Sequence, residues 1–200
     1  MQRRNLETAA ANYSYLRGLF FLPLGVLVIV SALGNWEVGP LRHTWTFPVA
    51  VVVIAAMCLA INRYYNDNYG RLSPSTRQQL RAAVAVAIAV AVTVGGSLLM
   101  RSRVSWSLDL PVNATAVSFA LIMLIQYAIG VGLRAHHVII WGAVLITGAL
   151  PVWTGADPSN IGLLLAGVAL MVDGVFDHRL FVQTFGSPKS PSLEERDVGA

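Results

Sequence analysis

Charged residues are scarce in this chain, and cysteine is nearly absent. Lys, Arg, Asp and Glu make up 12% of the 200 residues, whereas hydrophobic residues make up 56%. A soluble domain has about a quarter charged residues, so the composition argues against an ordinary soluble protein and indicates one embedded in a membrane. Cys58, the one cysteine, lies inside an apolar run and can form no intrachain disulfide. We interpret it as a small packing residue.

Several familiar site motifs are also missing. The sequence contains no phosphate loop, no Gly-x-Ser-x-Gly elbow, no His-Glu-x-x-His zinc motif and no Cys-x-x-Cys pair. It shows no aromatic-basic nucleic-acid module either. We therefore expect no organic cofactor and no nucleic-acid partner. The first five apolar runs carry no charged residue near their centres, which argues against a stand-alone proton pump or ion-coupled transporter.

Six long apolar runs occupy most of the chain. A helix needs roughly 20 residues to cross ~30 Å of hydrocarbon, and in lipid it satisfies its own backbone hydrogen bonds. The sequence thus predicts an all-α integral membrane protein, a six-transmembrane-helix bundle over residues 17–182. Residues 1–16 are expected to be a cytoplasmic N-terminal segment and 183–200 a flexible cytoplasmic tail. The predicted helices cover about 18–33, 44–61, 82–100, 112–133, 138–153 and 161–180.

Basic residues gather on every second connection between these runs. One side holds Arg3, Arg4, Arg17, Arg63, Arg71, Arg77, Arg81, Arg134, Arg179, Lys189 and Arg196, and the other side holds Arg42, Arg101 and Arg103. Basic residues favour the cytoplasmic side of a membrane, so both termini are predicted to be cytoplasmic. The predicted location is a plasma membrane, namely the inner membrane of a bacterium, where anionic lipids contact the basic side.

The sixth run contains the most unusual ionisable residue, Asp173. Asp173 lies twelve residues after Ile161, so a spanning helix places it in the inner leaflet or its interface. Asp177 follows one helical turn later on the same face. His178 comes directly after Asp177. Arg134, His136 and His137 come directly after the fourth run, on the same predicted side of the membrane. The candidate catalytic residues are therefore Asp173, Asp177, His178, Arg134, His136 and His137.

Three interpretations of this convergence stay open. The carboxylates can pair with Arg134, Arg63 or Arg81 and hold helix ends in register, because an unpaired carboxylate at that depth is costly. Asp173 and Asp177 can instead hold Mg²⁺ against a diphosphate headgroup. Thirdly, aspartate and histidine together can bind a transition metal.

A short pattern recurs after the second and sixth runs. In each copy a basic residue is followed by aromatic residues at positions two and six, and then by glycine; the residues are Arg63, Tyr64, Tyr65 and Tyr69, and Arg179, Phe181 and Phe185. One interpretation is a short interfacial helix with its rings at headgroup depth. The other is a duplicated docking element for a soluble partner.

Small residues recur every four positions in the third run and mark a similar face of the fourth, which predicts close helix packing. They are Ala83, Ala87, Ala91 and Gly95, and Ala116, Ala120, Ala128 and Gly132. These stripes can join helices within one chain or form a homo-oligomer.

With short outer loops and no energy module, the sequence favours a non-enzymatic subunit of a transport or export assembly. Its expected partners are membrane lipids and a partner subunit such as an ATPase. The competing hypothesis is an intramembrane enzyme that acts on a lipid or isoprenoid diphosphate headgroup at the cytoplasmic leaflet, so whether the chain is an enzyme stays open.

Overall fold

All described elements of the chain are helical. The computed structural model describes residues 17–43, 45–70, 112–130, 132–150 and 158–186, together with residues 76, 79, 80, 83, 84, 87 and 88. The elements are η1 (Gly18–Phe20), α2 (Phe21–Asn35), η2 (Gly39–Arg42), α3 (Thr46–Tyr69), α5 (Ala114–Gly130), α6 (Ala135–Ala149) and α7 (Pro158–Phe185). The predicted all-helical architecture is confirmed over these ranges. Most of the predicted helix 82–100 and nearly all of both terminal segments lie outside them.

Three stretches of helix are long and apolar enough to cross a membrane. They are Gly18–Asn35, which joins η1 to α2, then α3, and Ser159–Phe185 within α7. The helices α5 and α6 are apolar but shorter, with 17 and 15 residues. At 1.5 Å per residue α6 extends only about 22 Å. The described part of the chain is therefore compatible with a membrane protein, and the count of six spans and the orientation stay predictions.

The helices end at different residues from those that hydropathy predicts. The helix expected to end at Ile61 continues as α3 to Tyr69, and Gly70, with φ of 81°, follows it. Polar residues maintain the helix beyond the apolar run, and Arg63 and Asp67, one turn apart, approach to 3.6 Å. Hydropathy thus marks the apolar layer, whereas glycine in the left-handed region marks the helix end.

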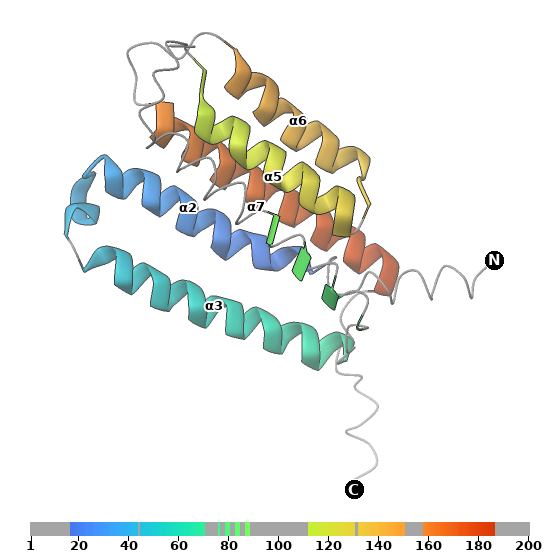
Figure 1. Cartoon of the computed structure of the whole chain (residues 1–200). Coiled ribbons are helices and arrows are strands. Elements are labelled where there is room, and N and C mark those ends of the chain that lie inside the picture. The colour runs from blue at the N-terminus through green and yellow to red at the C-terminus, as the bar shows by residue number, and fades with distance from the viewer. Residues whose placement is uncertain are drawn as a thin grey trace, which may run out of the picture.

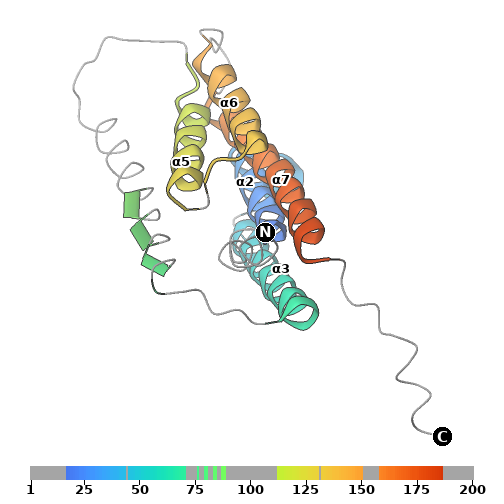
Figure 2. The ribbon, with the colours of Figure 1, turned by 90° about the vertical axis from the view of Figure 1, so that its right-hand side faces the viewer.

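The helices run side by side, with α2 and α7 in the middle (Figure 1). The pair α5 and α6 packs on α7, and α3 packs on α2. Seen from the side, α3 again stands apart from α5 and α6 (Figure 2). Only 6% of the apolar stretch of α3 is buried, compared with 44% of that of α7. The centre of the described bundle is therefore α7, which packs on α2, α5 and α6 and also meets α3 near its end.

Close packing of η1 and α2, which form one stretch of helix, against α7 depends on two pairs of glycines. A Cβ atom added at Gly174 would lie 2.6 Å from the carbonyl oxygen of Gly18, and one added at Gly25 would lie 2.6 Å from that of Gly167. The two helices are antiparallel, and on each of them the two glycines are seven residues apart. Small residues let helix backbones approach in lipid, where hydrophobic burial gives little driving force.

The predicted stripe on α5 is correct only in its first half. Ala116 and Ala120 are fully buried against α6 and α7, as expected. Ala128 is exposed, and Gly132 lies beyond the end of α5 with φ of 88°. Because a helix turns by 100° per residue, a strict spacing of four drifts around it, and the buried face continues instead through Met123 and Tyr127.

Candidate functional site

The candidate site lies where the middle of α7 meets α5 and the start of α6. Asp173 and Asp177 lie one turn apart, so both point from α7 toward these two helices. They are 0% and 1% exposed. Since burying a carboxylate is costly without compensating partners, their contacts decide what the site can do.

Asp173 is held by hydrogen bonds to only one of its two oxygens. The Tyr127 hydroxyl, from α5, donates to Oδ2 at 2.5 Å, and the Trp141 Nε1–H, from α6, donates to the same oxygen at 2.9 Å. The other oxygen, Oδ1, is buried and has no hydrogen-bond partner among the described residues. A buried polar atom of this kind is rare and calls for an explanation.

One carboxylate oxygen of Asp177 contacts three polar side chains at the start of α6. Its Oδ1 lies 3.1 Å from Nε2 of His136, 3.2 Å from Nε2 of His137 and 3.5 Å from Nη1 of Arg134. Because a carboxylate only accepts hydrogen bonds, both imidazoles donate from Nε2 in this arrangement. Asp177 therefore ties α7 to the first turn of α6.

The start of α6 is shaped so that both histidines point inward. Arg134 is extended and precedes the helix, and its backbone N–H donates to Nδ1 of His137 at 3.4 Å. This contact satisfies a backbone donor at the helix start. The His137 ring also stacks on the Tyr127 ring, with centroids 3.6 Å apart. Two contacts thus fix the His137 ring.

The structure brings most of the predicted site residues together. Asp173, Asp177, Arg134, His136 and His137 form one group, whereas His178 points toward α3, where its Nδ1 lies 3.0 Å from the Tyr65 hydroxyl. We call those first five residues the polar cluster.

The three predicted cationic partners differ in their placement. Arg134 approaches Asp177, whereas Arg63 approaches Asp67 of its own helix. Arg81, the third arginine considered, lies outside the described residues.

Two residues that hold Asp173 were missed by sequence reasoning. Tyr127 and Trp141 look like ordinary apolar residues of their runs. Trp141 follows His137 by four residues, so it shares the histidine's face of α6, and Tyr127 continues the buried face of α5. A polar-tipped aromatic on the same face as an ionisable residue is the signal that would have found them.

The residues of the repeated basic-aromatic pattern pack against one another where α3 ends beside α7. Tyr65 and Phe181 are fully buried, with ring centroids 5.0 Å apart, and the Phe181 ring also lies 4.6 Å from that of Tyr69 and 4.7 Å from that of Phe185. The Tyr64 ring lies 5.5 Å from that of Tyr65. We call this the aromatic cluster.

The basic residues of the same pattern face outward. The Arg63 side chain is 86% exposed, and Arg179 is exposed. Arg17 approaches the aromatic cluster from the start of η1, with its guanidinium carbon 4.6 Å from the Tyr65 ring centroid. The rings therefore join helices, and the arginines remain on the surface.

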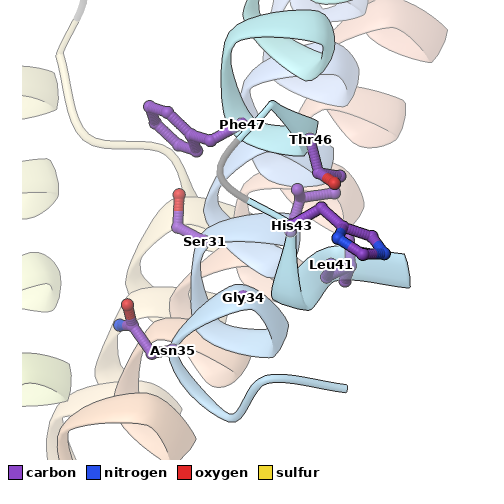
Figure 3. A pocket seen from close by; sticks show the side chains of 8 residues that line it. Ser31, Gly34, Asn35, Leu41, His43, Thr46 and Phe47 are labelled. Atoms are coloured by element: carbon purple, nitrogen blue, oxygen red, sulfur yellow. The ribbon is translucent and has the colours of Figure 1, made fainter. Parts of the chain in front are cut away.

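A separate pocket of about 430 Å³ lies at the other end of α2. It is lined by Val30, Ser31, Gly34, Asn35, Leu41, His43, Thr46 and Phe47. Figure 3 shows that its walls come from the end of α2 and the start of α3, with the connecting segment between them. His43 is its one ionisable lining residue, so the pocket has no acid-base pair, and the polar cluster remains the better site.

Comparison of the chain with known protein families, with characterised proteins and with solved structures finds no match.

Proposed function

We propose that this chain is a non-enzymatic membrane subunit of a transport or export assembly in the plasma membrane. The helices provide the membrane-embedded part, and the polar cluster connects three of them. A soluble energy-supplying partner, such as an ATPase, would contact the cytoplasmic side.

The observation that carries this proposal is the burial of both carboxylates. Asp173 and Asp177 are 0% and 1% exposed and already contact side chains of α5 and α6. Because protein side chains already occupy the contacts of both carboxylates, an enzyme acting on a diphosphate headgroup would have to separate α7 from α6. A cluster that ties helices together fits a subunit whose task is to hold a membrane scaffold in one arrangement.

Surface charge at one end of the bundle supports a cytoplasmic contact. Arg63 and Arg179 are exposed beside the aromatic cluster, which fixes the ends of α3 and α7 relative to each other. Exposed arginines on a rigid support suit recognition of carboxylates on a partner protein.

The test is purification of the full chain from its own membranes in mild detergent. We expect a stoichiometric partner polypeptide to stay bound through size-exclusion chromatography. Replacing both exposed arginines, Arg63→Gln with Arg179→Gln, should weaken its retention at least tenfold, whereas His43→Gln at the opposite end should not.

The enzyme hypothesis makes the opposite prediction. Recovery of a monodisperse lone chain that turns over a lipid diphosphate with Mg²⁺, and loses this activity in Asp173→Asn, would refute the proposed function. Retention of the partner by the double arginine variant would refute the docking surface only.

A further inference from the structure

We propose that the polar cluster is a closed binding site for one divalent transition-metal ion of the zinc class, with His136, His137, Asp173 and Asp177 as its ligands. This inference goes beyond the proposed transport role and does not depend on it. The ion would serve as a structural link between α6 and α7.

Four potential ligand atoms converge in the polar cluster. Nε2 of His136, Nε2 of His137 and an oxygen of Asp177 lie within 4.8 Å of one another. Asp173 Oδ1 joins them, at 3.9 Å from Nε2 of His136 and 3.8 Å from Nε2 of His137. Zinc is bound by nitrogen and carboxylate oxygen at ~2.0–2.2 Å, so two ligands of a tetrahedral site lie about 3.3 Å apart. The four separations from histidine nitrogen to carboxylate oxygen, 3.1–3.9 Å, bracket this value.

One carboxylate oxygen of Asp173 has no hydrogen-bond partner among the described residues. Tyr127 and Trp141 both hold Oδ2, which turns Oδ1 toward the histidines. Oδ1 is buried and makes no hydrogen bond to any described residue. Hydrogen bonds to the non-ligating atom of a carboxylate are how proteins orient a metal ligand. A metal ion at the centre of the cluster would give Oδ1 the partner it lacks.

The ligand types select the metal class. Imidazole nitrogen suits zinc and its first-row neighbours, whereas magnesium prefers oxygen ligands and keeps several waters. Two histidines in a largely buried site therefore disfavour Mg²⁺. Four protein ligands with no open position are typical of a structural zinc site, in contrast to a catalytic one.

Metal binding would change several contacts of the polar cluster, because the ion replaces the hydrogen bonds from the two Nε2 atoms to Asp177. Each histidine must release its Nε2 proton, so the proton of His137 moves to Nδ1 and the Arg134 N–H loses its acceptor there. Arg134, whose side chain is 29% exposed, would also turn away from Asp177 toward solvent. Its Nη1 makes an ion pair with Asp177 at 3.5 Å but no hydrogen bond to a described residue, so the metal ion would take the place of this ion pair. The two carboxylates then balance the charge of the ion.

The experiment titrates the tag-free full chain, held in lipid nanodiscs and stripped with a chelator, with Co²⁺ and Zn²⁺. We expect one equivalent of Co²⁺ per chain with the strong visible absorption of tetrahedral cobalt, displaced by Zn²⁺. His136→Gln and Asp173→Asn should each lower the affinity more than tenfold, and Tyr127→Phe about tenfold because the ligand loses its support. The matched control His178→Gln should bind as the parent does.

Three results would overturn the proposal: no saturable binding, equal binding by His136→Gln and Asp173→Asn, or competition by Mg²⁺ at the same concentration as Zn²⁺. If those two variants fail to give monodisperse protein, X-ray absorption of the zinc-loaded parent decides, since it must show two imidazoles and no sulfur. Partner recovery and metal titration are separate measurements, so either idea can fail alone.

Discussion

The contact of α2 with α7 gives the sharpest quantitative prediction, through Gly174→Ala. The new Cβ atom would lie 2.6 Å from the carbonyl oxygen of Gly18 and 2.8 Å from Cβ of Phe21. Ordinary contacts of a Cβ atom begin near 3.4 Å, so the helices must separate by about 0.8 Å locally, and a backbone carbonyl cannot rotate aside as a flexible side chain does. Overpacking of this kind costs about 1–3 kcal/mol.

Gly142→Ala on α6 is the matched control. A Cβ atom at Gly142 meets nothing within 4 Å, yet the substitution has the same favourable effect on helix propensity, about 1 kcal/mol. The difference between the two variants therefore isolates the clash. We expect Gly174→Ala to be less stable than Gly142→Ala by about 1–3 kcal/mol in equilibrium unfolding of the chain in mixed micelles. Equal stability of the two variants would refute the close packing of α2 on α7.

Three further predictions use the same unfolding assay. Phe181→Ala should lower the free energy of unfolding by about 3–5 kcal/mol, because the Phe181 ring is fully buried in the aromatic cluster. The control Phe176→Ala, at a residue that is 44% exposed, should lower it much less. Similar losses in the two variants would contradict the packing of the aromatic cluster. Trp141→Phe should cost about 1.5–3 kcal/mol by removing one donor to the Asp173 carboxylate, and an unchanged stability would show that this hydrogen bond contributes little. The Asn35 side-chain amide donates a hydrogen bond to Asn160 at 2.8 Å. Asn160→Ala removes this acceptor and should lower the free energy of unfolding by about 1 kcal/mol. A loss no larger than that of an alanine substitution at an exposed position would contradict this prediction.

The fold class could be predicted because composition acts over long segments. Low charge and long apolar runs predict helices in a membrane wherever they occur, and the described residues are indeed helical. The ends of helices depend on local events. The continuation of α3 to Tyr69 depends on polar residues that hydropathy cannot distinguish from a loop, and Gly70 ends it through its backbone conformation.

The candidate site was predictable for the charged residues and histidines that α7 and the start of α6 supply. The spacing of Asp173 and Asp177 already places them on one face, and Arg134 follows from its position at the start of α6. The donors Tyr127 and Trp141 could not be selected, because which face of α5 and α6 meets α7 depends on how three helices pack. His178 was included for its neighbourhood in sequence, although 100° of rotation from Asp177 turns it toward α3.

The glycine pairs of α2 and α7 were missed for a related reason. Gly18 and Gly25 are seven residues apart, and so are Gly167 and Gly174, but neither pair is notable alone. Their meaning appears only when two antiparallel helices are aligned so that each glycine faces another.

The short length of α6 has a consequence for the lipid around it. Its roughly 22 Å falls short of an average hydrocarbon layer by about 8 Å, and it carries Arg134 and both histidines of the polar cluster at its start. Such a hydrophobic mismatch costs fractions of a kcal/mol per Å and is relieved when the surrounding bilayer thins. If α6 spans the membrane, as the sequence predicts, thin bilayers should therefore stabilise this side of the protein relative to thick ones.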